Sequence, residues 1–514
     1  MEMFIKIGML VIFFGVMLFI GFKSRNSARD INGFVLGGRS VGPWLTAFAF
    51  GTSYFSAVVF IGYAGQFGWK FGISATWAGI GNALIGSLAA WAILGRRTRV
   101  ITNHLKSATM PQFFGERFKS QGLRIWSAVI TFVFLIPYTA SLFNGLSRLF
   151  GMAFNVDYSV CVVVMAVLTA IYVIVGGYMA TAINDFIQGI IMIFGICAVI
   201  FSVLKLNGGF MSALEGLAMV TDESVSSVPG VFASFFGPDP VSLLGVVLLT
   251  SLGTWGLPQM VQKFYAIKSE DDISKGMIIS TVFAFIVAGG SYFLGGFGRL
   301  FSDKLDIASN GYDSIIPTMI GELPIFLISV VVILVLSASM STLSSLVLTS
   351  SSVLTLDFLM VVGLKKAKEK TVVLIMKALV VLFIALSVAI AIIQHKSSVT
   401  FIAQLMGISW GALAGAFLAP FIYGLYWKRT TKQAVLVNFI FSVAIMTGNI
   451  FFKDFFPTIL RSPINLGTFC MLAGLLIVPL VSLMTTPPEK SHIEFAFSCY
   501  KKPLEQRKEA LTEE

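Results

Sequence analysis

Apolar segments long enough to cross a membrane make up most of this chain. A bilayer needs about 20 consecutive apolar residues in helical form, and the sequence contains thirteen such windows. Because lipid offers no hydrogen-bond partner to exposed backbone groups, these segments must form helices. We therefore predict an all-α integral membrane protein. The windows cover residues 4–21, 44–65, 71–95, 124–150, 156–176, 182–206, 241–261, 276–299, 320–356, 372–393, 399–427, 433–452 and 464–485.

The composition argues against several other classes of protein. Charged residues make up only 12% of the chain, against about 25% in soluble domains. The net charge of +11 does not indicate nucleic-acid binding, because the basic residues lie in short clusters between apolar segments rather than on one solvated surface. The three histidines lie far apart and leave little material for a zinc site or for acid–base catalysis. We predict a protein of the lipid bilayer that is not an enzyme and has no nucleic-acid partner.

The clusters of Lys and Arg predict the orientation of the chain. When the connections are assigned alternately to two sides, one side receives residues 96–99, 365–366 and 428–429 and most of the 36 Lys and Arg residues. Cytoplasmic loops carry an excess of basic residues. We therefore expect a multi-pass protein of the plasma membrane with its N-terminus outside and its C-terminus in the cytoplasm.

One predicted helix combines strong hydrophobicity with a row of hydroxyl groups. It lies in the apolar run 324–356. Neutral oxygen atoms are ligands that a small hard cation accepts in place of water, which favours a sodium site. Small polar residues also let membrane helices pack closely, and this alternative stays open. At 100° per residue the shared face consists of Ala338, Ser341, Thr342 and Ser345, extended by Thr349 and Ser352.

Two predicted helices contain interruptions at mid-membrane depth. Residues 51–56 break the second helix, and residues 250–256 followed by Pro258 break the seventh. Interruptions five helices apart are typical of a five-plus-five inverted repeat, in which unwound backbone exposes carbonyl groups to ions and solutes. Each could equally be a Gly/Ser packing notch. Asp185 is expected to open the sixth helix, where it either caps that helix or draws a cation inward.

Three motifs resemble those of the sodium:solute symporter family. They are residues 171–188, with Gly176, Gly177, Asp185 and Gln188, together with residues 109–118 and residues 337–345. The resemblance implies a LeuT-type fold of about 13 helices, with a five-plus-five inverted repeat and one extra N-terminal helix. It also implies sodium-coupled import of a small organic solute by alternating access.

The resemblance divides the chain into six parts. These are a leading helix and loop (1–43), a first repeat of five helices (44–206), an extracellular loop (207–240), a second repeat of five helices (241–427), two C-terminal helices (428–485) and a cytoplasmic tail (486–514).

The resemblance also implies the site residues, with Na⁺ as the coupling ion. The main sodium site would use carbonyl oxygens of Thr52, Phe55 and Ala338 and hydroxyls of Ser341 and Thr342. A second sodium would use Asp185, Ser344 and Ser345. The expected solute-binding residues are Ser53, Ser56, Gln66, Tyr138, Thr254, Trp255 and Pro258.

The solute is expected to be an amino acid such as proline, since Tyr138 and residues 256–264 resemble the proline branch of the family. The chain departs from that branch at Tyr54, where an aspartate is usual, at Val58, where a tryptophan is usual, and at Thr250 and Thr254, where aromatic residues are usual. A carboxylate or sugar-like solute, or a proton-coupled transporter of the same fold, therefore remains an alternative.

Overall fold

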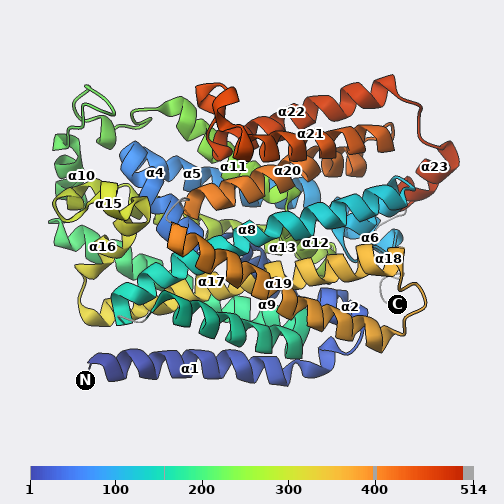
Figure 1. Ribbon diagram of the computed structural model, residues 1–514, viewed down its shortest axis with the longest axis horizontal. Helices are drawn as coiled ribbons and strands as arrows, with labels where there is room; N and C mark the ends of the chain where they lie inside the picture. Colours follow the sequence, from blue (N-terminus) through green and yellow to red (C-terminus); the bar gives the residue numbers. More distant parts are fainter. Residues whose placement is uncertain (1, 155–156, 398–401, 502–514) are drawn as a thin grey trace.

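The computed structural model describes residues 2–154, 157–397 and 402–501, and this part of the chain is helical with no β-strand (Figure 1). The long helices run close to the long axis of the molecule. They include α1 (Glu2–Lys23), α3 (Pro43–Tyr54), α8 (Gln121–Phe154), α9 (Tyr158–Leu206), α11 (Pro240–Gly256), α13 (Asp271–Ala284), α17 (Ile325–Val353), α19 (Glu369–Ser397), α20 (Ile402–Tyr426), α21 (Lys432–Phe451) and α22 (Pro463–Met484).

Nine of the described helices are long and apolar enough to cross a membrane, or ten when one bent pair counts as a span. The thirteen predicted spans stay a prediction. Part of the difference comes from α9, whose 49 residues would extend about 74 Å if straight. Gly177 interrupts α9 with φ 55° and ψ −150°, a backbone conformation that residues with a Cβ rarely adopt. The apolar stretch at Ile7–Lys23 is one of the shorter helices.

Both predicted helix interruptions are confirmed. Helix α3 ends at Tyr54, and Phe55 is extended with φ −82° and ψ 115°. The chain becomes helical again in η3 (Val58–Tyr63) and α4 (Ala64–Phe71). The second break separates α11 from α12 (Pro258–Ala266), which are bent by 48°. Leu257 is extended there. Pro258 occupies the first position of α12, where a backbone N–H would have no partner inside the helix, so its missing N–H costs nothing.

Helix α17 lies inside the bundle. It packs against α3, α8, α9 and α19, and its residues from Val331 to Val353 are buried. The hydroxyl face predicted for this helix therefore points into protein rather than into lipid.

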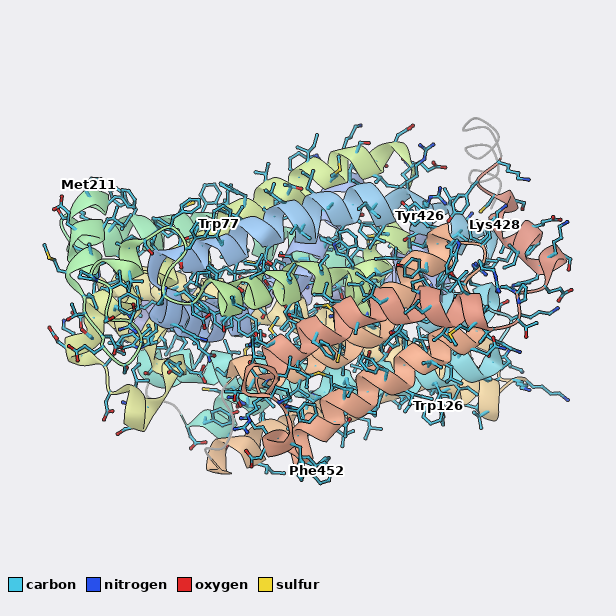
Figure 2. All side chains as sticks on the ribbon, turned by 90° about the horizontal axis from the view of Figure 1, so that it is seen from above. Trp77, Trp126, Met211, Tyr426, Lys428 and Phe452 are labelled. Atoms are coloured by element: carbon cyan, nitrogen blue, oxygen red, sulfur yellow. The ribbon has the colours of Figure 1, made fainter. Side chains whose placement is uncertain are left out.

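The two ends of the molecule differ in charge and in the segments they carry. Helix α1 begins at the end that holds α10 (Phe210–Met219), and α6 (Arg96–His104) and α23 (Lys490–Ser498) lie at the other end (Figure 1). Met211 and Lys428 mark these opposite ends in Figure 2. The arginine-rich α6 touches the region of α23, since the Tyr500 hydroxyl, just after α23, donates to the Arg97 carbonyl oxygen at 3.1 Å.

Residues 207–240, predicted to be an extracellular loop, form a docked segment. The Arg299 guanidinium lies 3.0 Å from a carboxylate oxygen of Asp222 and 3.7 Å from the centre of the Phe232 ring. It also donates a 2.6 Å hydrogen bond to the carbonyl oxygen of Trp69 in α4. One buried cation thus ties two interior points of the segment to α4.

Candidate functional site

Five oxygen atoms meet between the break in α3 and the hydroxyl face of α17. The Thr342 hydroxyl lies 3.0 Å from the Thr52 carbonyl oxygen, 3.3 Å from that of Phe55 and 3.0 Å from that of Ala338. The Ser341 hydroxyl lies 3.3 Å from the Thr52 oxygen and 3.2 Å from the Ala338 oxygen. The structure thus brings together all five residues expected at the main sodium site. We call this group the oxygen cage.

The oxygen cage has fewer protons than contacts. Its three carbonyl groups can only accept hydrogen bonds, and Ser341 and Thr342 carry one hydroxyl proton each. Two protons are therefore shared among five close contacts between oxygen atoms. The carbonyls at the end of α3 have lost the amide partners that a continuous helix would supply. A small cation would satisfy all five oxygen atoms at once, and no charged side chain would have to be neutralised when it leaves.

Two of the three residues expected at a second sodium site, Ser344 and Ser345, lie one turn further along α17. The Ser344 hydroxyl donates to the Ser341 carbonyl oxygen at 2.9 Å. Ser345 contacts two side chains, at 2.8 Å from the Ser53 hydroxyl and 3.0 Å from the Lys263 ammonium nitrogen. Asp185 is fully buried in α9, and neither of its carboxylate oxygens has a hydrogen-bond partner among the described residues. The second site stays a prediction.

The helix-cap role considered for Asp185 does not fit its position. The helical segment resumes directly after Gly177, eight residues before Asp185, instead of opening at Asp185. A capping carboxylate accepts hydrogen bonds from the first amides of its helix, and the oxygens of Asp185 accept none from the described part of the chain.

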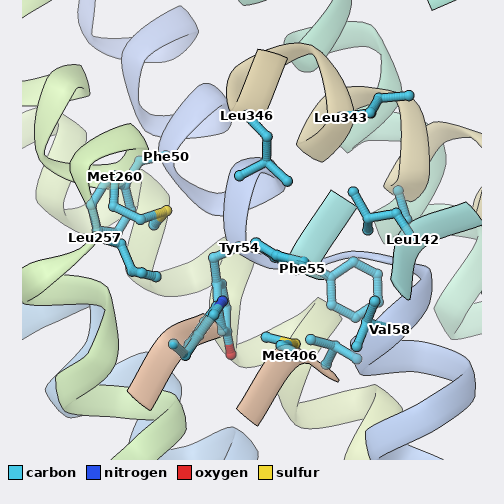
Figure 3. Close-up of a cluster of buried hydrophobic side chains, with 14 of the residues drawn as sticks. Phe50, Tyr54, Phe55, Val58, Leu142, Leu257, Met260, Leu343, Leu346 and Met406 are labelled. Atoms are coloured by element: carbon cyan, nitrogen blue, oxygen red, sulfur yellow. The ribbon is translucent and has the colours of Figure 1, made fainter. Parts of the chain in front are cut away.

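Two of the expected solute-binding residues, Ser56 and Tyr138, face one another near Trp410 of α20. The Tyr138 and Trp410 rings meet edge to face at 5.9 Å, and Tyr54 lies 6.1 Å from the same Trp410 ring. Figure 3 shows Tyr54 at the α3 break, between the second broken span and α20. Further close polar contacts link Asn82 with Tyr54 and Tyr292.

Each side chain of this group has a buried polar atom without a hydrogen bond of ordinary geometry within the described chain; for Asn82 this is the amide nitrogen, since its side-chain oxygen accepts from Ser251 at 3.2 Å. Buried polar atoms are normally paired, so an unpaired group calls for a ligand or water. We call this group the polar cluster. It consists of Tyr54, Ser56, Tyr63, Asn82, Tyr138, Tyr292 and Trp410.

The other expected solute-binding residues lie elsewhere. Thr254 donates to the Gly86 carbonyl oxygen at 3.0 Å, and the Trp255 indole donates to that of Ile85 at 3.0 Å. Both side chains thus bond to the third predicted span. Three expected solute-binding residues remain. Ser53 bonds to Ser345, and Gln66 lies on α4 with its side-chain oxygen unpaired in the described structure. Pro258 lines a separate small cavity.

Sequence reasoning missed Tyr63, Asn82, Tyr292 and Trp410. Each is a single polar or aromatic residue inside an apolar segment, and such residues are usually part of the core. The one usable signal was Tyr54, which replaces an aspartate of the resembled branch.

The cavity beside Pro258 has a volume of about 10 Å³ and is also lined by Thr349 and Ser352, which extend the hydroxyl face. Thr349 donates to the Gln262 side-chain oxygen at 2.7 Å. Beyond it, Asp357 accepts hydrogen bonds from Thr109 at 2.5 Å and from Arg124 at 2.8 Å. The motif that contains Thr109 therefore ties the end of this helix to its neighbours.

Comparison with known families decides what this arrangement belongs to. The family described as "SSF: Sodium:solute symporter family" matches residues 34–441. This chain belongs to the sodium:solute symporter family. The symporter is 29% identical over 455 residues to the osmoregulated proline transporter OpuE of Bacillus subtilis, covering 86% of this chain and 87% of OpuE. It is 30% identical over 441 residues to the sodium/proline symporter of Staphylococcus aureus strain JH9, covering 83% of this chain and 82% of that relative.

The fold is shared with a solved transporter. A Na⁺-coupled sialic acid symporter in a substrate-bound outward-open state matches with a TM-score of 0.75 and 16% identity, covering 95% of this chain and 99% of that one. This likeness confirms the LeuT-type fold predicted from the motifs. The protein is a multi-pass symporter of the plasma membrane that couples sodium to a small-molecule solute, and not an enzyme.

Proposed function

We propose that this symporter imports a small amino acid of the proline type together with Na⁺ held in the oxygen cage. The observation that carries the ion assignment is the meeting of five neutral oxygen atoms with only two hydroxyl protons between them. The names of the relatives from Bacillus subtilis and Staphylococcus aureus support proline as the first solute to test.

The polar cluster suits a small zwitterion. Its hydroxyl, amide and indole groups, including those of Tyr138 and Trp410, are neutral donors for a carboxylate. The aromatic faces of Tyr54 and Trp410 give an apolar ring a surface to pack on and attract an ammonium group through their π electrons. None of the seven members carries a formal charge at neutral pH, so a zwitterion would not be held by a full opposite charge that hinders its release.

Sodium and solute would bind cooperatively through the break in α3. Tyr54 stands in the chain between Thr52 and Phe55, whose carbonyl oxygens belong to the oxygen cage. An ion that fixes both carbonyls also fixes Tyr54 in the polar cluster, so each ligand increases the affinity for the other. In this proposal α3 and α11 begin the repeats 44–206 and 241–427, since each is followed by a break inside a predicted span.

One sodium ion supplies a useful driving force. Moving one charge through 100 mV is worth about 2.3 kcal/mol, and a tenfold sodium gradient adds about 1.4 kcal/mol. The sum corresponds to nearly three decades of solute accumulation per ion. Neutral ligands also release the ion readily on the side where sodium is scarce.

We also propose that the end with α6 and α23 is cytoplasmic. The basic clusters around Arg97 and Lys428 lie at that end, opposite Met211 of the docked segment, and basic residues favour the cytoplasmic side. A protease site placed after residue 501 should be cut only in inside-out vesicles. Cleavage in right-side-out vesicles alone would reverse the orientation.

Uptake of labelled proline into proteoliposomes tests the proposed function. Accumulation should require an inward sodium gradient and should be lost when choline replaces sodium at the same proton gradient. Accumulation in choline driven by protons would refute sodium coupling. Absence of sodium-driven proline accumulation, together with sodium-driven accumulation of a labelled carboxylate or sugar, would refute the proline assignment.

A matched pair of tyrosine variants tests the polar cluster. Tyr138→Phe should raise the KM for the solute by about 10- to 100-fold, because a group that bonds to a carboxylate contributes about 1.5 to 3 kcal/mol. Tyr423→Phe is the control, since the Tyr423 hydroxyl donates to the Leu475 carbonyl oxygen at 2.8 Å away from the cluster. Equal effects of the two variants would remove Tyr138 from the site.

A further inference from the structure

A buried lysine occupies the region where a second sodium was expected. Lys263 lies in α12, just past the second helix break, and only 1% of its surface is exposed. Its ammonium nitrogen donates to the Ser345 hydroxyl at 3.0 Å and lies 5.0 Å from the centre of the Tyr178 ring. A hydrogen bond and a cation–π contact thus hold a fixed positive charge against one of the expected sodium ligands.

The hydrogen bonds around Ser345 have a definite direction. The Ser53 hydroxyl donates its one proton to the Ala49 carbonyl oxygen at 2.5 Å, so at its 2.8 Å contact with Ser345 it can only accept. Ser345 therefore donates to Ser53 and accepts from Lys263. The lysine thus already uses one of the two lone pairs that Ser345 would offer to a sodium ion, and it places its own positive charge beside the other.

Asp185 supplies the matching negative charge. Its carboxylate is fully buried in α9, about two helical turns after Tyr178, whose ring centre lies 5.0 Å from the Lys263 ammonium nitrogen. An isolated charge is costly inside a membrane protein, whereas two opposite charges compensate one another. With Lys263 in place the region is neutral, and an added sodium ion would leave an uncompensated positive charge there.

We propose that the ammonium group of Lys263 takes the place of a second coupling sodium, so that one Na⁺ enters per transport cycle. The inference rests on the proposed function, because it assigns that single ion to the oxygen cage. The lysine stays attached to the protein and contributes no net charge movement over a full cycle. The maximal ratio of solute concentrations across the membrane then stays near three decades, whereas coupling to two sodium ions would double that number of decades.

Equilibrium binding of ²²Na⁺ to the purified full-length protein in lipid nanodiscs tests the inference without any solute. The wild type should bind one ion per chain. Lys263→Gln keeps a donor for Ser345 but removes the charge that compensates Asp185, so it should bind two. The double variant Lys263→Gln/Asp185→Asn is neutral again and should return to one. Lys275→Gln, on the exposed face of α13, is the matched control and should bind one.

Each result decides between defined outcomes. Two ions in the wild type, or one ion in a folded Lys263→Gln variant, would overturn the inference and leave the oxygen cage intact. No saturable binding to the wild type would instead contradict the proposed function. If Lys263→Gln does not fold, Asp185→Asn still decides: the inference requires that one ion remains bound, and loss of that ion would show that Asp185 is itself a sodium ligand.

Discussion

Removing the two hydroxyls of the oxygen cage should nearly abolish sodium binding. The double variant Ser341→Ala/Thr342→Val keeps the volume of the threonine but removes two of the five oxygen atoms that meet there. A hydrogen-bonding group that faces a charge contributes about 1.5 to 3 kcal/mol. The pair is therefore worth about 3 to 6 kcal/mol, or a 10²- to 10⁴-fold rise in the Kd for sodium.

The assay is the sodium-induced rise in the melting temperature of the purified protein, measured as a function of sodium concentration against choline. The same hydroxyls bond to the carbonyls of Thr52 and Ala338 when no ion is bound. The variant is therefore expected to lose about 2 kcal/mol of stability in choline as well. The quantity to compare is the Kd for sodium obtained from the dependence of the shift on sodium concentration, which is separate from that loss.

A matched control in the same helix separates the two effects. Ser351 is buried in α17, and its hydroxyl donates only to the Leu348 carbonyl oxygen of the same helix among the described contacts. Ser351→Ala should leave this Kd for sodium unchanged. A change of less than about fivefold in the Ser341→Ala/Thr342→Val variant would show that the cage does not hold the ion.

Three further predictions follow from other contacts. Thr349→Ala/Ser352→Ala removes the hydroxyls that line the small cavity and should slow ²²Na⁺ exchange several-fold; an unchanged rate would remove the cavity from the ion path. Gly177→Ala should lower the free energy of unfolding by about 1 to 3 kcal/mol, because φ is +55° there and a Cβ would lie 3.1 Å from neighbouring atoms; an unchanged melting temperature would contradict this. The pKa of Asp222 lies below its ordinary value, because the Ser224 side chain donates to the carboxylate and a nearby guanidinium attracts it. The stabilisation is therefore present above the unfolded pKa and is lost as pH falls through the lower folded pKa. Protease resistance of the docked segment should persist from pH 8 to about pH 5 and fail in stronger acid. In Asp222→Asn the resistance should be weaker at neutral pH and independent of pH.

The order of residues along the chain was enough to predict the local features. The length of the apolar segments determines helices, because lipid cannot satisfy a bare backbone. Gly and Pro near residues 51 and 258 mark positions where a helix is interrupted, and both breaks are present. The spacing of Ala338, Ser341 and Thr342 determines that they share a face. These features depend on residues within a few turns of one another, so periodicity and backbone preference are sufficient to find them.

The contacts between distant segments were decided only by the tertiary structure. Tyr138 and Trp410 come from helices far apart in the sequence and meet because α8 packs on α20. Lys263 reaches Ser345 because the bend at Leu257 directs α12 toward α17. Most faces of these helices are apolar, so hydrophobicity alone does not specify which helix lies beside which. The close fit of side chains in the folded bundle specifies it, and this fit creates both the polar cluster and the place of the lysine.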